Sequence, residues 1–363
     1  MTKRLTTNLR FGWTTGTCAT AAVNAAYTAM VTGAFPERVS VITPGGKEAD
    51  LKVAFTDQGQ DWVKVGIIKD AGDDPDVTHG AMIIACLRQG LPQSGVTFTR
   101  GDGIGLITKP GLPIAVGEPA INPVPRQMMA EAIKQLAAAL DGPRDIIIEI
   151  SVPDGAKIAL KTWNPRLGIE GGLSILGTTG VVRPFSCSAW IASIHRGIDV
   201  ARANGLAHVS GSTGSTSEKA VITRYDLPEI ALMDMGDFVG GMLKYMRRNP
   251  VANLTIAGGF AKMAKLGQGA IDLHSARSQV DFTALADLAT ACGYDHDIVA
   301  NANSVLDVVQ QGTPEMRVKL ANAIAAAAQK TALGVVAGAA VNIEILVVAR
   351  DGEINGTAGT IKP

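Results

Sequence analysis

The sequence has few aromatic residues, few cysteines and no net charge. Phe, Trp and Tyr make up 4% of the 363 residues, which argues against an aromatic-rich β-sandwich and favours helices and sheets that pack through small side chains. The 33 basic and 33 acidic side chains cancel, so nothing draws the chain to nucleic acid or to an anionic membrane surface. A polyanionic ligand would have to be held by local placement of Arg and Lys.

The four cysteines, Cys18, Cys86, Cys187 and Cys292, form no Cys-x-x-Cys pair and fit neither a zinc site nor a disulfide framework. We expect buried, reduced thiols in a cytoplasmic protein. The N-terminal residues lack the apolar core of a secretory signal. The longest apolar runs fall short of the roughly 18 residues that a membrane-spanning helix needs.

Apolar residues make up 47% of the chain, and its length suggests two domains. The first half predicts an α+β pattern that begins with an alanine-rich helix over Thr14–Gly33, ended by Gly33. A second helix is expected over Gln127–Leu140, after a segment, INPVPR, that should block helix formation. The expected strands are 38–43, 50–55, 61–69, two within 95–108, and 145–151, and residues 79–89 form a short amphipathic segment.

In the second half a strand, a glycine-rich loop and a helix follow one another several times, which indicates a mostly parallel α/β sheet. The boundary falls near residues 185–195, and we place the domains at 1–190 and 191–363. The expected strands are 207–209, 230–234, 253–257 and 343–348, and the expected helices are 189–204, 238–247, 262–267, 282–292, 300–311 and 314–331.

The stretch from Trp163 to Pro184 holds five glycines and only three charged side chains. Because glycine loses more backbone entropy on folding than any other residue, the cluster indicates positive φ, close packing of backbones or close approach of backbone to a ligand. The aliphatic residues between the glycines exclude a flexible linker. Two explanations of the stretch are possible from the sequence: it packs between the domains, or it forms a surface that binds a ligand.

Two earlier segments could also meet a ligand. A Thr-Thr-Gly-Thr run opens the first helix, where free N–H groups and the helix dipole favour an anion, although an ordinary N-cap is the alternative. Five prolines then fix an extended path between residues 109 and 126, which could present polar side chains or form a structural crossover. The residues in question are Thr14, Thr15, Gly16, Thr17, Lys109, Glu118, Asn122 and Arg126.

The segment Ser210–Glu218 reads SGSTGSTSE and directly follows a short predicted strand. In open α/β sheets, ligands bind beside the carboxyl ends of the strands. The loop has neither the spacing of a dinucleotide fingerprint nor the lysine of a P-loop, but a nucleotide or nucleoside suits it best. Loops at Asp234–Asp237 and Ala257–Phe260 end the next two strands, so we expect all three on one edge of the sheet.

Histidine is sparse, and His79 and His274 each have either a structural or a functional role. The acidic residues from Asp73 to Asp76 are better explained as a solvated turn than as a cation site. No metal site is expected.

Four segments together resemble the CbiD family of cobalt-precorrin-5B C1-methyltransferases. They are TTGTCA at 14–19, ITKPGLPIAVGEPAINPVPR at 107–126, WNPRLGIEGGLSILGTTGVVRP at 163–184 and HSARSQVDF from His274. The resemblance covers essentially the whole chain. It implies an α+β N-terminal domain similar to a permuted ribosomal protein S5 domain 2-like fold, and a C-terminal three-layer α/β/α domain. It also implies methyl transfer from S-adenosylmethionine (SAM) to C1 of cobalt-precorrin-5B, giving cobalt-precorrin-6A in anaerobic cobalamin biosynthesis.

On this interpretation SAM lies at the edge of the C-terminal sheet and the corrinoid lies between the domains. Methyl transfer needs in-line positioning more than a nucleophilic residue, and the cobalt belongs to the substrate. His274 and Glu118 are candidates for proton transfer. The expected SAM contacts are Ser210, Gly211, Ser212, Thr213, Gly214, Ser215, Glu218, Asp234, Gly236, Gly258 and Gly259. The expected corrinoid contacts are Thr14, Thr15, Gly16, Thr17, Lys109, Asn122, Arg126, Asn164, Arg166, Thr178 and Thr179.

Two other classes of protein stay open. A corrinoid-binding or carrier protein would need the surface that binds the corrinoid ring, but it would not need a second loop that binds a nucleoside. An α/β enzyme with a nicotinamide or nucleotide cofactor could use Ser210–Glu218, with Asp234 about 20 residues further on as the acidic residue. A homodimer is also conceivable, through an apolar pair of C-terminal helices.

Overall fold

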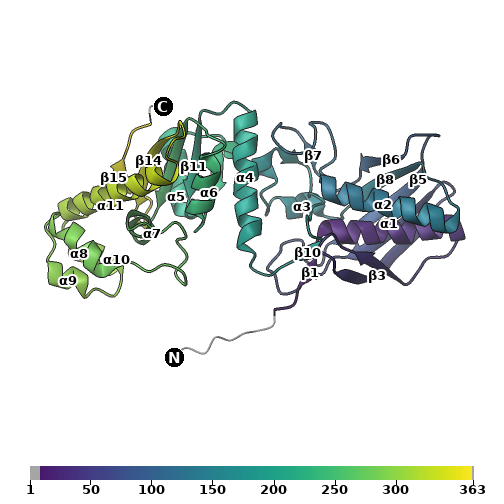
Figure 1. Cartoon of the computed structure of the whole chain (residues 1–363), viewed down its shortest axis with the longest axis horizontal. Coiled ribbons are helices and arrows are strands. Elements are labelled where there is room, and N and C mark those ends of the chain that lie inside the picture. The colour runs from purple at the N-terminus through teal and green to yellow at the C-terminus, as the bar shows by residue number, and fades with distance from the viewer. Residues whose placement is uncertain (1–8, 362–363) are drawn as a thin grey trace. The chain divides into compact units, whose positions relative to one another are not determined.

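A computed structural model describes residues 9–361. The chain divides into two compact units, one up to Ser186 and one from Cys187 onward (Figure 1). Both units contain helices and sheets, so the fold is mixed α/β with several sheets. Residues 1–8, part of the stretch from which no secretory signal is expected, lie outside the described residues.

The first unit is built on a six-stranded sheet of order β2-β3-β4-β5-β8-β6. All neighbours are antiparallel except β6 and β8, which are parallel. The strands are β2 (Arg38–Ile42), β3 (Glu48–Gln58), β4 (Trp62–Ile68), β5 (Met82–Gln89), β6 (Val96–Arg100) and β8 (Ile146–Ser151). The amphipathic segment 79–89 is thus mostly an inner strand, β5, whose residues alternate between the two faces of the sheet.

Helix α1 (Thr15–Thr32) packs against β4, β5 and helix α2 (Pro123–Leu140), and Figure 1 shows the two helices side by side. Its many alanines let it approach both neighbours closely, so most of the helix is buried. The Thr14 hydroxyl accepts the Thr17 N–H at 3.2 Å, and Gly33, at φ +78°, ends the helix.

The expectation that INPVPR blocks helix formation was wrong. Helix α2 begins at Pro123, and Pro125 lies in its first turn. The first N–H groups of a helix have no acceptor within it, so proline costs little there. The remaining short elements of the unit are β1 (Gly12–Trp13) with β10 (Val181–Val182), β7 (Leu106–Ile107) with β9 (Ile169–Glu170), α3 (Gly155–Ala159) and η1 (Pro165–Leu167).

The second unit contains a five-stranded sheet of order β12-β11-β13-β14-β15. The first four strands are parallel and β15 is antiparallel to β14. The strands are β11 (His208–Ser212), β12 (Leu232–Asp234), β13 (Asn253–Gly258), β14 (Asn342–Val348) and β15 (Ile354–Ala358). The sequence pattern missed β15 and ended β11 too early, at Val209.

Helix α5 (Ser215–Tyr225) packs on one face of this sheet, where Ala220 and Val221 meet Ala257, Leu346 and Val348. Helix α11 (Pro314–Val335) contacts β14 and β15. The helix expected over 300–311 is wrong in part, because residues 301–304 separate α9 from α10. The other helices are α4 (Cys187–Ala203), η2 (Glu229–Ala231), α6 (Val239–Met246), α7 (Phe260–Gly267), α8 (Phe282–Thr290), α9 (His296–Ala300) and α10 (Val305–Gln311).

None of the four cysteines forms a disulfide within residues 9–361; Cys18, Cys86 and Cys292 are buried, and the surface of Cys187 is partly exposed. Burial raises the pKa of the Cys18 thiol to about 12, so that thiol is unreactive in the folded protein. Over residues 9–361, no helix has both the length and the apolarity to cross a bilayer.

Candidate functional site

The carboxyl ends of β11, β12, β13 and β14 meet at one edge of the second unit's sheet. Ser212 at the end of β11 lies beside Asp234 of β12 and Ala257 of β13. The Thr213 N–H donates to the Ala257 carbonyl at 3.0 Å, and the Gly236 N–H donates to the Ser212 carbonyl at 3.1 Å. The three loops that the sequence placed on one edge are therefore held together there.

A cavity of about 340 Å³ opens at this edge. Its volume is within the range of small-molecule sites. The predicted residues Thr213, Gly214, Ser215 and Gly259 line it, together with residues that the sequence reasoning missed. Of these, Thr216 and Ser217 belong to the predicted loop Ser210–Glu218 without having been singled out, and Val348, Ala349 and Arg350 lie outside every segment that was predicted to bind a ligand.

The N-terminus of α5 forms one wall of the cavity, and no side chain caps it. The cap residue Gly214 is exposed and extended, with φ 168° and ψ 175°. A Cβ atom added there would meet nothing within 4 Å. Because the first N–H groups of a helix have no acceptor within it, this wall offers backbone donors and a favourable dipole to a polar ligand.

The other residues predicted to bind SAM do not line the cavity. Ser210, Gly211 and Ser212 are buried within β11. Gly211 faces the Met235 and Met242 side chains, so the alternation of the strand turns both serines toward the α5 face. Neither serine hydroxyl has a hydrogen-bond partner among the described residues.

Gly258 and the loop after β12 pack against side chains next to this edge and do not line the cavity. A Cβ atom on Gly258 would lie 2.8 Å from the Thr213 side chain, so a glycine is needed for the two loops to approach. The Trp190 indole donates to the Asp234 carbonyl at 2.9 Å, and its ring lies 3.8 Å from where a Cβ on Gly236 would stand. Glu218 lies in the first turn of α5.

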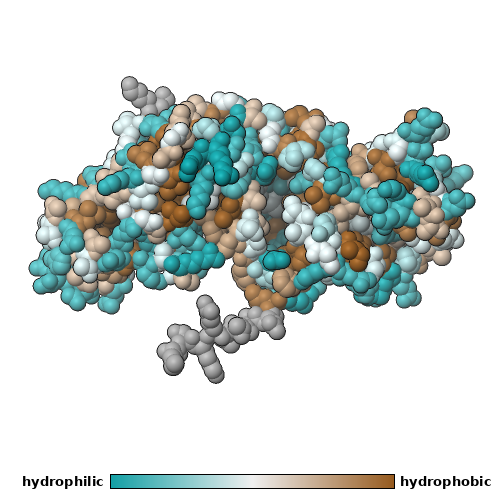
Figure 2. Space-filling view, in the orientation of Figure 1, coloured by the Kyte–Doolittle hydropathy of each residue, from teal (hydrophilic) through white to brown (hydrophobic). Residues whose placement is uncertain are grey.

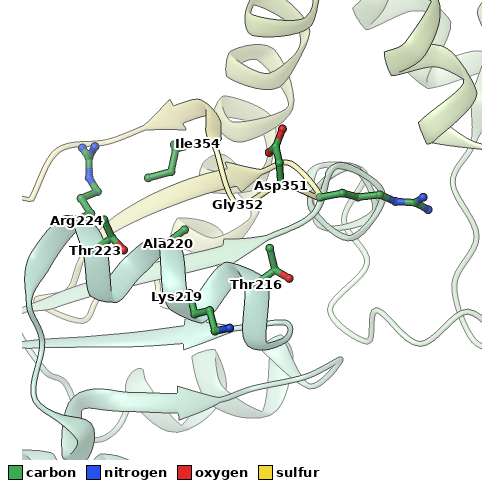
Figure 3. A pocket seen from close by; sticks show the side chains of 9 residues that line it. Thr216, Lys219, Ala220, Thr223, Arg224, Asp351, Gly352 and Ile354 are labelled. Atoms are coloured by element: carbon green, nitrogen blue, oxygen red, sulfur yellow. The ribbon is translucent and has the colours of Figure 1, made fainter.

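A second hollow of about 640 Å³ continues along α5 (Figure 3). We call it the α5 groove. One side is a single face of the helix and the other is the turn between β14 and β15. The groove shares Thr216 and Arg350 with the cavity. Its full lining is Thr216, Lys219, Ala220, Thr223, Arg224, Arg350, Asp351, Gly352 and Ile354.

In the first unit, the threonines at the start of α1 are buried against the glycine-rich stretch. The Thr15 hydroxyl contacts the carbonyls of Ser174 and Leu176 at 3.3 and 3.2 Å, and the Gly16 N–H donates to the Leu176 carbonyl at 3.0 Å. The Thr17 hydroxyl donates to the Gly180 carbonyl at 2.7 Å. The Gly16 and Thr17 N–H groups at the start of α1 therefore have acceptors within the chain.

The glycines of that stretch permit this approach. Gly177 has φ +138°, and a Cβ atom there would lie 2.2 Å from the Thr14 hydroxyl oxygen. A Cβ on Gly172 would lie 2.3 Å from the Gly103 carbonyl oxygen. The stretch packs backbone against backbone within the first unit.

The remaining predicted corrinoid residues fall into two groups. Arg126 donates to the Ile121 carbonyl at 2.8 Å and pairs with Glu118 at 3.1 Å, and Asn164 donates to the Gly172 carbonyl at 2.9 Å. These side chains therefore stabilise the fold of the first unit through contacts within the chain. Arg126 is itself half-exposed, and the others with exposed or half-exposed surface are Lys109, Asn122, Arg166, Thr178 and Thr179.

His274 is exposed on the segment after α7. Its Nδ1 accepts the Ala276 N–H at 3.2 Å, while the neighbouring Arg277 pairs with Asp272 at 2.6 Å. Among the described residues, no group of three or more His, Cys, Asp or Glu side chains could hold a metal ion.

Two family models match separate parts of the chain. Family models described as CbiD and as the CbiD C-terminal domain match residues 2–184 and 272–359. A cobalt-precorrin-5B C(1)-methyltransferase from Brucella anthropi is 56% identical, over 95% of each chain. One from Paramagnetospirillum magneticum is 56% identical, over 96% of this chain and 98% of the relative.

A crystal structure of the cobalamin biosynthesis protein CbiD from Archaeoglobus fulgidus is also similar. It is 27% identical, covers 69% of this chain and 77% of its own, and has a TM-score of 0.39. With both family models matched and relatives more than half identical along nearly its full length, the chain belongs to the CbiD family.

Proposed function

We propose that this chain is a cobalt-precorrin-5B C1-methyltransferase of cobalamin biosynthesis, which uses SAM and yields cobalt-precorrin-6A. The observation that carries the proposal is 56% identity, over 95% of each chain, to a relative that bears this enzyme's name. The proposal includes a cytoplasmic enzyme, with a permuted S5 domain 2-like first domain (1–190) and a three-layer second domain (191–363).

We place the methyl donor in the cavity at the edge of the second sheet. SAM supplies an electrophilic methyl group on a sulfonium. The chain's own contribution is to hold the donor in line with the accepting carbon, which is the main requirement of methyl transfer. The uncapped N–H groups at the start of α5, the Thr213 hydroxyl and the bare backbone of Gly214 and Gly259 offer hydrogen bonds and space for a nucleoside.

The reaction needs no covalent intermediate on the protein. A bond forms between C1 and the methyl carbon, the sulfur–methyl bond breaks, and S-adenosylhomocysteine leaves with the electron pair of that bond. We assign the macrocycle to the first unit, whose exposed or half-exposed Lys109, Asn122, Arg166, Thr178 and Thr179 can meet its carboxylates. Thr14, Thr15 and Thr17 act by fixing the glycine-rich stretch behind them.

The test is transfer of label from SAM that carries a radioactive methyl group, under anaerobic conditions, to cobalt-precorrin-5B. We expect one label per corrinoid and an equal amount of S-adenosylhomocysteine. A protein that binds the corrinoid but transfers no label would be a carrier instead. A thermal shift with NAD(P) but none with SAM would favour the nicotinamide alternative.

A further inference from the structure

Two basic side chains that line the α5 groove have no acidic partner among the described residues. Lys219 and Arg350 are exposed, and neither forms an ion pair with any residue between 9 and 361. On the helix, Thr216 and Lys219 are three residues apart and share a face. Both line the groove together with Asp351, and Figure 3 shows them on α5, with Asp351 on the turn between β14 and β15. Figure 2 shows a hydrophilic area beside hydrophobic surface in the part of the second unit where β11 is labelled in Figure 1.

The third basic side chain of the groove, Arg224, already forms an ion pair with Glu344. Its guanidinium lies 3.2 Å from Glu344, a side chain with no exposed surface. Glu344 also accepts from the Tyr225 hydroxyl at 2.6 Å and from the Thr255 hydroxyl at 3.3 Å. A fully buried carboxylate needs its partner, so Arg224 is held for Glu344 and the available cations are Lys219 and Arg350.

The groove also offers one carboxylate. Asp351 is exposed, and its side chain accepts only the Glu353 N–H, at 3.0 Å, among the described residues. Two free cations and one free carboxylate, beside the Thr216 hydroxyl, match the two charges of an α-amino acid. A phosphate or a simple polyanion carries no positive group that the Asp351 carboxylate could bind.

The groove and the cavity adjoin each other, because Thr216 and Arg350 line both. We propose that the α5 groove binds the α-amino-acid end of the methyl donor: Lys219 and Arg350 bind its carboxylate, and Asp351 binds its ammonium. The inference rests on the proposed function, because it takes the ligand of the adjoining cavity to be SAM. The nucleoside end then lies in the cavity, beside Gly214 and Gly259.

The test compares two ligands that share a nucleoside. S-adenosylhomocysteine carries the amino-acid group, and 5′-methylthioadenosine lacks both its carboxylate and its ammonium. Calorimetric titration of each ligand is made on the wild type and on Lys219→Gln, Arg350→Gln and Asp351→Asn. The control is Lys244→Gln, which removes an exposed lysine from α6 in the same unit.

We expect each of the three groove variants to weaken S-adenosylhomocysteine by about tenfold, the scale of one charge-assisted hydrogen bond. Binding of 5′-methylthioadenosine should stay unchanged in Lys219→Gln and Asp351→Asn, which lie outside the lining of the cavity. Arg350 also lines the cavity, so Arg350→Gln should weaken S-adenosylhomocysteine more than 5′-methylthioadenosine. The thermal stability should stay unchanged, and the control should bind both ligands like the wild type. Unchanged S-adenosylhomocysteine binding, or equal weakening of both ligands, would overturn the inference. So would a rise confined to the KM for cobalt-precorrin-5B, which would assign the groove to the substrate's carboxylates.

Different outcomes would overturn the proposed cofactor and the groove assignment. A wild type that binds neither nucleoside ligand overturns the proposed cofactor and the groove assignment with it. A wild type that binds S-adenosylhomocysteine and transfers methyl, while the groove variants bind it equally well, overturns only the groove assignment.

Discussion

Replacing Gly214 by valine should close the cavity without unfolding the protein. The backbone at Gly214 is extended, with φ 168° and ψ 175°, a conformation open to any residue. An added Cβ meets no atom within 4 Å. Valine is a poor helix cap, which costs about 1 kcal/mol, so the melting temperature of a domain of this size should fall by only ~2–4 °C.

The effect on binding should be larger, because the new methyl groups project into a space that the ligand is proposed to fill. The cavity holds about 340 Å³, which leaves a nucleoside little room to shift. Overpacking of this kind costs about 2 kcal/mol. That loss corresponds to a rise of about thirtyfold in the dissociation constant for S-adenosylhomocysteine.

Calorimetric titration of S-adenosylhomocysteine into Gly214→Val measures this rise. The matched control is Gly334→Ala, because Gly334 in α11 also has nothing within 4 Å of an added Cβ and alanine favours a helix. The control should bind like the wild type. An unchanged dissociation constant in the valine variant, with the protein folded, would remove the α5 N-terminus from the site and refute the placement of the donor.

Three further predictions concern the rest of the fold. Gly177→Ala should lower the free energy of unfolding by about 2 kcal/mol or more, because its Cβ would lie 2.2 Å from the Thr14 hydroxyl at φ +138°; a denaturant titration that matches the wild type would contradict the packing described. Asp76→Asn should cost about 3–5 kcal/mol at neutral pH, because Asp76 lies 2.7 Å from the buried Lys69 ammonium. Burial alone would raise the pKa of Asp76, but the Lys69 charge and the hydrogen bonds from its neighbours outweigh it and hold that pKa below its ordinary value of 3.8. The stabilisation is therefore full above that value and is lost as pH falls through the depressed pKa, so the gap between wild type and variant should narrow in acid, and a gap independent of pH would contradict this. Finally, a thiol reagent should modify Cys187 quickly in the native protein and the other three cysteines only after unfolding; fast modification of a second thiol would show that the described burial is wrong.

The edge of the second sheet could be predicted from sequence because one rule governs it. Apolar strands, each followed by glycine, indicated parallel strands whose carboxyl ends share an edge. The same rule applied to Ile343–Val348 would have brought Arg350 into the site. Lys219 gave no such signal, because its place in the groove depends on which face α5 turns outward.

Other parts could not be predicted, for physical reasons. Ser210 and Ser212 are polar but lie inside β11, so a pattern based on apolar residues ended the strand too early. The strand β15 reads INGTA, with little apolar content and an internal glycine, and it is stabilised by pairing with β14 rather than by its own propensity. For the glycine-rich stretch, composition indicated close approach, but only the structure identified Thr14 and Gly103 as what is approached.

The proposed reaction moves one methyl group from SAM to C1 of the corrinoid. Incubation with cobalt-precorrin-5B and SAM labelled with ¹³C in its methyl group, followed by carbon NMR of the product, tests it directly. We expect one new enriched methyl carbon, attached to C1, and one equivalent of S-adenosylhomocysteine. Enrichment of a methyl group on another ring carbon, or recovery of unmethylated corrinoid with intact SAM, would contradict methyl transfer to C1.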